Sequence, residues 1–177
     1  MGSQKALLAI QGREAWLHLA NKMLEAGCTR VAIGIPTTLE STLAPSIVPG
    51  SKLGPVVIPE EERQRGPIGT LCYLIQGTEA GYRECLVAPV DHPYVTVDTI
   101  RCLLQSEGPI RIPTFEGRRG HPIVLDAAMA ARVPGIEGTL RSLCRDPGIA
   151  TVEIPVADPA ILWNLDHPED YERFGRG

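Results

Sequence analysis

Two aspartates, Asp91 and Asp166, have the surroundings best suited to chemistry in this sequence. Each follows an apolar residue and precedes a His-Pro pair, in "VDHP" at 90–93 and "LDHP" at 165–168. A carboxylate at the end of a buried strand is costly to leave unpaired. Because a magnesium ion that also binds substrate phosphates needs only one or two protein oxygens, the two acids together could hold one divalent cation. Each could instead cap the helix that follows it, where negative charge is favourable.

Three further segments carry groups that bind phosphates. "RGPIGTL" at 65–71 places glycines and a threonine before a predicted helix, where free backbone N–H groups can receive a nucleotide. "EGRRGHP" at 116–122 is a cationic loop that could hold a phosphorylated ligand, although a solvated surface loop explains the same residues. Lys5, in "SQKALL", stands at the mouth of a small-residue segment, and taken singly it is an ordinary surface lysine.

Histidines and cysteines give weaker signals. His92, His121 and His167 each precede a proline, but they lack the close pairing of ligands that structural zinc sites show. The five cysteines are odd in number, widely spaced and contain no C-x-x-C pair, which favours free thiols that act as small buried hydrophobes. The sequence therefore favours neither a zinc centre nor a disulfide framework.

Length and composition restrict the class of protein. The chain has 177 residues, of which 44% are hydrophobic and 21% charged, so we expect one globular domain over residues 1–177. The apolar runs are too short to span a membrane and we recognise no signal peptide, so a cytoplasmic protein is expected. A net charge of −4 argues against binding to nucleic acid, which requires a concentrated basic face.

Apolar periodicity predicts alternating strands and helices, with "EEERQRG" at 60–66 as a solvated loop. Strands are expected at 31–35, 54–59, 84–90, 109–115 and 149–156, and helices at 14–26, 68–76, 96–105, 124–133 (helix or strand and helix), 138–146 and 167–174, with one short helix near 39–44. This alternation predicts a three-layer α/β fold, with a mostly parallel sheet and helices on both faces. Ligands of such folds bind beyond the carboxyl ends of the strands, which is where Asp91 lies.

The order of these segments resembles the MobA-like nucleotidyltransferase family, most closely its molybdenum cofactor cytidylyltransferase branch. The matching stretches are "MGSQKALL", "LEAGCTRVAIGI", "RGPIGTL", "LVAPVDHPYVTVDTIRCLL", "IRIPTFEGRRGHPIVL", "GTLRSL" and "LWNLDHPEDYERF". The resemblance implies a Rossmann-like nucleotidyltransferase fold. In that family a strand and a glycine-rich loop precede the "MG" segment, so we expect this chain to lack the usual first strand. Two sheet edges would then be exposed, which favours association, for example as a homodimer.

The resemblance also implies roles for individual residues. Asp91 and Asp166 would hold Mg2+, and Lys5 would contact the phosphates of the nucleotide. The nucleotide would also be lined by Gly66, Pro67, Gly69, Thr70 and Leu71, and the acceptor by Arg119, Gly120, His121 and Pro122. The catalytic residues expected on this basis are Lys5 and Asp91.

The implied reaction joins a nucleoside monophosphate from CTP or GTP to a phosphorylated acceptor, such as the molybdopterin cofactor, and releases pyrophosphate. Two alternatives stay open. The chain could be a shortened, catalytically lapsed relative that binds a nucleotide or a partner protein, or it could act on a sugar or lipid precursor at the same site.

Overall fold

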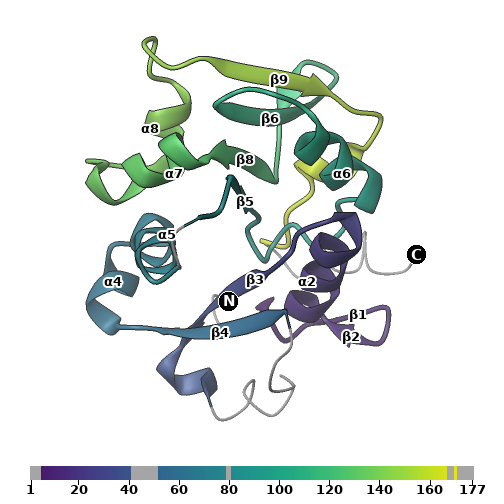
Figure 1. Cartoon of the computed structure of the whole chain (residues 1–177). Coiled ribbons are helices and arrows are strands. Elements are labelled where there is room, and N and C mark those ends of the chain that lie inside the picture. Colours follow the sequence, from purple (N-terminus) through teal and green to yellow (C-terminus); the bar gives the residue numbers. More distant parts are fainter. Residues whose placement is uncertain (1–4, 41–51, 79–80, 167–169, 171–177) are drawn as a thin grey trace.

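The computed structural model describes residues 5–40, 52–78, 81–166 and 170, which form an α/β fold (Figure 1). The described helices are α2 (Ala15–Ala26), α4 (Glu60–Gln64), α5 (Pro67–Gln76), α6 (Val97–Gln105), α7 (Ala127–Arg132) and α8 (Leu140–Cys144), with short 3-10 turns η1 (Thr37–Leu39), η3 (Val133–Gly135) and η4 (Pro159–Leu162). The strands are β1 (Ala9–Ile10), β2 (Arg13–Glu14), β3 (Val31–Pro36), β4 (Leu53–Ile58), β5 (Glu84–Val87), β6 (Ile110–Phe115), β7 (Arg118–Arg119), β8 (Ile123–Asp126) and β9 (Thr151–Pro155).

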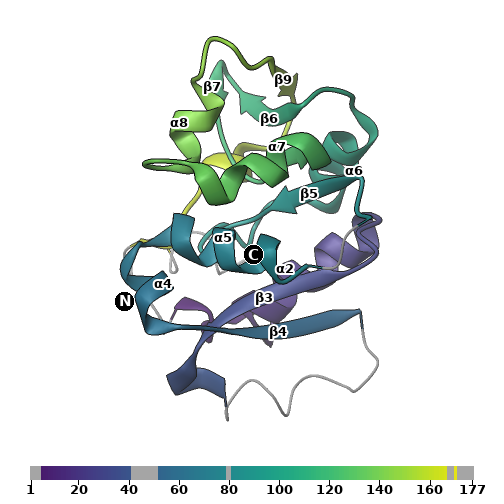
Figure 2. The same ribbon diagram turned by 60° about the vertical axis from the view of Figure 1, so that its left-hand side comes forward.

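The described strands form separate sheets. β3 and β4 make a parallel pair, while β5, β8, β6 and β7 lie side by side in that order and β9 joins β6 in parallel. Figure 2 shows the β3–β4 pair and the larger sheet on opposite sides of the molecule, with β5 on the side of the larger sheet that is nearer to β3. The predicted α/β class and Rossmann-like fold are therefore confirmed.

Strand direction differs from the expected mostly parallel sheet, because β8 pairs antiparallel with both β5 and β6. The strand occupies the first part of the segment 124–133, where "VLD" is too short for its periodicity to reveal a direction. A second difference is α4, which forms where a solvated loop was predicted. Its first turn carries three glutamates, which the positive end of the helix dipole stabilises.

Apolar side chains pack on both faces of the larger sheet. On one face, β6 and β8 pack against α5, α7 and α8 through a cluster that includes Ile110, Leu125 and Leu143. A second cluster, with Leu19, Ile100 and Ile161 at its centre, joins α2, α6 and η4. The helices thus cover the sheet on two sides, as expected, and leave the segments after β5 and η4 to meet at one end.

None of the helices in the described ranges is both long enough and apolar enough to cross a membrane. The helix predicted over 167–174 and most of the one predicted near 39–44 fall outside the described residues.

Candidate active site

Asp91 lies in a turn that follows β5, and it does not cap a helix. The next helix, α6, begins at Val97, and its cap is Thr96, whose side chain accepts a hydrogen bond from the N–H of Thr99. The capping role considered for Asp91 is therefore wrong, because five residues separate the aspartate from the helix. One carboxylate oxygen of Asp91, Oδ1, is buried and has no hydrogen-bond partner in the described part of the chain.

A backbone hydrogen bond brings the second acid next to the first. The N–H of Leu165 donates to the carbonyl oxygen of Asp91 at 2.9 Å, so Asp166 follows directly at the same turn. Asp166 accepts a hydrogen bond from Lys5 Nζ at 2.7 Å and another from Asn164 Nδ2 at 2.5 Å. The Lys5 side chain is 14% exposed, so this ammonium is largely buried beside the two acids and is not an ordinary surface lysine.

Two histidines complete this end of the molecule. The rings of His92 and His121 lie 4.8 Å apart, and His92 Nε2 is 4.0 Å from Asp91 Oδ1. Burial lowers the pKa of His121 to about 4, and the adjacent His92 adds to the decrease. Burial also lowers the pKa of His92, while the charges of Asp91 and Asp166 act in the opposite direction. His121 is therefore uncharged at neutral pH.

Two charged side chains brace the turn that holds Asp91. Lys22 of α2 donates to the carbonyl oxygens of Pro93 and Val95, both at 3.0 Å. Asp158 accepts from the N–H of Thr96 at 2.9 Å and is itself buried. These bonds fix the backbone of the segment that follows Asp91, although Oδ1 of Asp91 makes no hydrogen bond of its own in the described part of the chain.

The glycines of the predicted nucleotide segment have structural roles. Gly66 is the residue before α5 and has φ of +75°, a conformation that glycine adopts without strain. Gly69 faces α4, where an added Cβ would lie 2.0 Å from the carbonyl oxygen of Glu62. Gly69 therefore permits the two helices to pack closely, and this position alone explains why a small residue stands there.

The predicted acceptor segment is divided between two places. Arg119 donates to Glu153 Oε1 at 2.7 Å, on the exposed side of the β6–β9 pair, and does not line the cavity with His121. Gly120 packs against η4, since an added Cβ would lie 2.4 Å from the carbonyl oxygen of Ile161. That close approach allows the N–H of His121 to donate to the same carbonyl at 3.0 Å, which places the imidazole beside His92.

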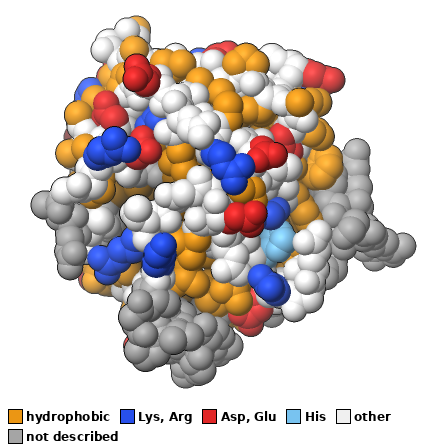
Figure 3. Space-filling model, turned by 45° about the vertical axis from the view of Figure 1, so that its right-hand side comes forward, with side chains coloured by type: hydrophobic (Ala, Val, Ile, Leu, Met, Phe, Trp, Pro, Cys, Tyr) orange, Lys and Arg blue, Asp and Glu red, His pale blue; other side chains and the backbone are white. Residues whose placement is uncertain are grey.

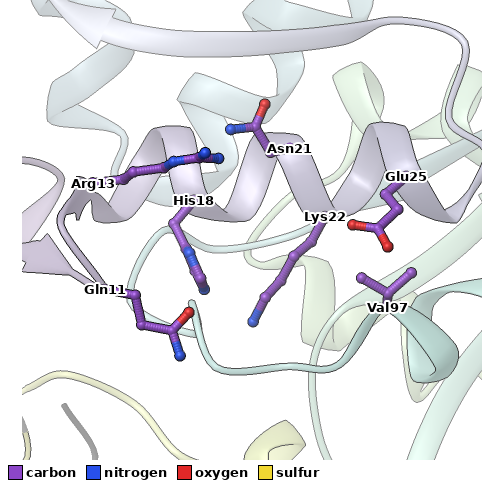
Figure 4. Close-up of a pocket in the computed structure, with 7 residues that line it drawn as sticks. All are labelled: Gln11, Arg13, His18, Asn21, Lys22, Glu25 and Val97. Carbon is purple, nitrogen blue, oxygen red and sulfur yellow. The ribbon is translucent and has the colours of Figure 1, made fainter. Parts of the chain in front are cut away.

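One open cavity of about 1800 Å³ joins these groups. Of the predicted site residues, it is lined by Lys5, Pro67, Thr70, Leu71, Asp91, His121 and Asp166, whereas Gly66, Gly69, Arg119, Gly120 and Pro122 do not line it. A second cavity, of about 390 Å³, lies on the outer side of α2, where His18 and Lys22 point the same way (Figure 4). The face in Figure 3 carries basic and acidic side chains that are interspersed rather than separated.

The acidic end of the cavity offers few ligands for a divalent cation. Among the described residues, no three histidine, cysteine or acidic side chains are grouped as metal ligands. Mg2+ needs fewer protein ligands, because it keeps several waters and uses one or two carboxylates with the phosphates of the substrate. The buried and unpartnered Oδ1 of Asp91, beside Asp166, fits such an ion.

Comparison with known proteins shows the family of this chain. The chain belongs to the MobA-like NTP transferase domain family, whose model matches residues 1–151. The family defines the class of enzyme, a nucleotidyltransferase.

Individual relatives add detail. The nicotine blue oxidoreductase of Paenarthrobacter nicotinovorans is 32% identical over 184 residues, which cover 96% of this chain and 87% of that protein. The structure of Rv0371c of Mycobacterium tuberculosis in complex with manganese has a TM-score of 0.81 at 17% identity, over 99% of this chain and 94% of that one. A nucleotidyl transferase of Methanothermobacter has a TM-score of 0.77 at 20% identity, over 97% and 83%. At these identities the two structures show a shared fold.

Sequence reasoning missed three residues that shape the site. His92 was considered only as a zinc ligand, although its place after Asp91 in "DHP" puts it at the same turn. Lys22 and Asp158 gave no signal, because each acts on the backbone or hydroxyl groups of residues far away in the sequence.

Proposed function

We propose that this chain transfers a nucleoside monophosphate from CTP or GTP to a phosphorylated acceptor such as the molybdopterin cofactor, and that residues 1–177 act as one nucleotidyltransferase domain. The observation that carries the proposal is the buried, unpartnered Oδ1 of Asp91 beside the Lys5–Asp166 ion pair. Two carboxylates and an ammonium that line one large cavity match the charges of a nucleoside triphosphate and its metal ion.

A phosphate oxygen of the acceptor attacks the α-phosphorus of the nucleotide, and the bond to the bridging oxygen of the β-phosphate breaks. Pyrophosphate leaves with the electron pair of that bond, so atoms and charge balance. Lys5 Nζ lies at the cavity and can exchange its bond to Asp166 for the oxygens of the departing pyrophosphate. Pro67, Thr70 and Leu71 line the same cavity from α5 and would contact the nucleotide.

Asp91 and Asp166 would hold Mg2+ or manganese, which neutralises developing charge on the phosphates. Rv0371c of Mycobacterium tuberculosis, which has a similar fold, was solved in complex with manganese, and this supports the proposal of a divalent cation. His121, uncharged at neutral pH and lining the cavity, can donate or accept a hydrogen bond without adding charge. We assign it to the acceptor.

The direct test is release of pyrophosphate by the purified chain with CTP or GTP, a divalent cation and molybdopterin. Asp91→Asn should lower kcat by about 10²-fold or more, because it removes a metal ligand while keeping the shape. Asp98→Asn is the matched control, since Asp98 lies on α6 and pairs with the exposed Arg101. Equal activity of both variants would contradict the assignment, as would failure of the folded chain to bind either nucleotide.

A second candidate activity follows from the relative named nicotine blue oxidoreductase, which is 32% identical to this chain. An oxidoreductase moves electrons between its substrate and a redox cofactor that the protein binds and orients. The half-exposed apolar residues of the large cavity, including Leu71 and Leu86, would suit an apolar compound. Reduction of nicotine blue by the purified chain with a reduced redox cofactor, without release of pyrophosphate, would favour this candidate over nucleotidyl transfer.

A further inference from the structure

The smaller cavity, on the outer side of α2, is lined almost entirely by polar side chains. We call this space, of about 390 Å³, the α2 pocket. It is lined by α2, by the β1–β2 turn and by the first residue of α6, Val97, and its polar side chains are those of Gln11, Arg13, His18, Asn21, Lys22 and Glu25. Within the described ranges, none of these residues lines the large cavity of the candidate active site. The α2 pocket is therefore a separate place in the fold.

Four of these side chains have hydrogen-bonding groups that the described part of the chain does not use. Gln11 and Asn21 carry amides, and Arg13 and His18 carry basic groups. No hydrogen bond or ion pair joins any of these four side chains to another described residue. Figure 4 shows Gln11, His18 and Lys22 extending in the same direction, with Arg13 alongside α2. Water can satisfy such groups, and a ligand with several acceptor oxygens can replace that water.

The charges around the α2 pocket are mostly positive. Arg13 and Lys22 are cations, and Glu25, the one carboxylate among the described lining residues, forms no ion pair with either of them. Burial lowers the pKa of His18, and the positive charges of Lys22 and Arg13 lower it further. Burial also lowers the pKa of Lys22, while the charges of Asp158 and Glu25 act in the opposite direction. An anion bound among the three basic groups would therefore relieve the repulsion between them.

Lys22 connects the α2 pocket to the candidate active site. Its ammonium donates to the carbonyl oxygens of Pro93 and Val95, both at 3.0 Å, in the segment that follows Asp91. An ammonium has three N–H donors, so one donor is left for a ligand after these two bonds. A ligand in the α2 pocket would therefore hold the same lysine that braces the segment after Asp91.

The size and the donors of the α2 pocket suit a small phosphorylated ligand. Its volume lies at the lower end of the range of about 300–1,000 Å³ that is typical of small-molecule sites. A guanidinium binds phosphate oxygens in a bidentate manner, and an ammonium binds them as a point charge. We propose that the α2 pocket binds a phosphate group, either the free ion or the phosphate of a small polar molecule, through Arg13, His18 and Lys22. The amides of Gln11 and Asn21 would bond hydroxyl groups of such a molecule.

The test follows the imidazole of His18 by NMR in the full chain, with its resonance identified by its loss in His18→Gln. Inorganic phosphate and glycerol 3-phosphate are the two probes, and glycerol and potassium chloride at matched ionic strength are the controls. Either probe should shift the His18 resonance saturably and raise the pKa of the ring, because a bound anion favours its protonated form. The probe that saturates at the lower concentration shows whether the ligand is the free ion or a phosphate ester.

Three results would overturn the proposal. Neither probe could shift the His18 resonance saturably, or the controls could produce the same shift. The third is a response of His92 and His121 alone, because these two histidines line the large cavity and a response confined to them would place the anion there.

Variants with opposite expected effects tie the binding to the α2 pocket. Arg13→Gln should raise the dissociation constant of the phosphate probe by about tenfold or more, because it removes a charge-assisted hydrogen bond. Glu25→Gln should lower that constant severalfold, because it removes the one carboxylate of the described lining. Both residues are exposed, so neither exchange disturbs the core.

Arg63→Gln is the matched control, because Arg63 lies on α4, outside the α2 pocket, and pairs with the exposed Glu60. It should leave the dissociation constant unchanged. Equal binding of phosphate by Arg13→Gln and Arg63→Gln would overturn the proposal. None of these measurements depends on nucleotidyl transfer.

Discussion

Two strands of the same sheet, β6 and β5, which β8 separates, differ in burial, in pairing and in the segments that follow them. β6 lies between β8 and β9 and is buried along nearly its whole length. β5 has one partner among the described strands, and all of its residues are half-buried. The segment after β5 carries Asp91 and His92, whereas β6 ends at the turn to β7. The region around β6 is thus a packed core, whereas the region around β5 borders the large cavity and the candidate site.

Matched leucines give the largest test of this difference. Leu125→Ala, at a fully buried position of β8, should lower the free energy of unfolding by about 2–5 kcal/mol, because it leaves a cavity in a packed core. Leu86→Ala, in the half-buried β5, should cost about 1 kcal/mol, since the side chain already borders a cavity. Urea denaturation of both variants measures the difference; equal losses would contradict the comparison.

The pH dependence of stability tests the histidine end of the open region. The pKa of His121 falls from 6.5 to about 4 on folding, so the unfolded chain binds a proton more readily between those values. Above about pH 6.5 the imidazole is neutral in both states and costs the fold nothing. As the pH falls toward 4, the unfolded chain takes up the proton first, and the free energy of unfolding falls by about 3 kcal/mol. The free energy of unfolding, measured across this pH range, should fall less in His121→Gln than in the unchanged chain. The same pH dependence in both would count against a buried neutral imidazole.

A buried and an exposed ion pair of the larger sheet should differ in their contribution to stability. Arg111 of β6 is 4% exposed and bonds Glu84 of β5 at 2.6 Å. Glu84→Gln should destabilise the fold by about 2 kcal/mol, because it leaves a buried guanidinium without its counter-charge. Glu153→Gln is the control: its partner Arg119 is exposed, and the loss should stay below about 1 kcal/mol. Thermal unfolding of the two variants measures both losses. A loss in Glu153→Gln as large as that in Glu84→Gln would contradict the prediction.

The smallest expected effect separates stability from function. Thr96→Ala and Asp126→Ala each remove a helix cap, and each should cost about 1 kcal/mol of unfolding free energy. Only Thr96 also bonds Asp158, which braces the turn of Asp91. Thr96→Ala should therefore raise the KM for the nucleotide severalfold, whereas Asp126→Ala should not. Steady-state kinetics of both variants measures the two KM values. Equal KM values would contradict a role of the Thr96–Asp158 hydrogen bond in positioning Asp91.

The sequence predicted the elements better than their surroundings. Of the strand predicted at 84–90, only Glu84–Val87 forms β5, and this strand was expected to be buried but is half-exposed. Periodicity shows that the side chains of a strand favour apolar neighbours. It does not show how many strands pair with that strand. Strand direction was missed at β8 for a similar reason, since direction depends on pairing with strands far away in the sequence.

The candidate site was predictable where residue type alone carries the signal. Asp91, Asp166, Lys5 and His121 do line one cavity, whereas Gly69 and Gly120 serve close packing instead. A glycine needed by a ligand and a glycine needed by a neighbouring helix look identical in sequence. The cap assigned to Asp91 failed because Thr96, five residues later, is the better placed hydroxyl.

The backbone hydrogen bond between Leu165 and Asp91 has a consequence for mutagenesis. Peptide groups, which no side-chain substitution removes, hold two segments 74 positions apart in register (165 minus 91). Exchange of either carboxylate therefore changes the charge without moving the scaffold on which it sits. A double-mutant cycle between Asp91 and Asp166 would measure the energetic coupling of the two carboxylates, free of a contribution from shifted main chain.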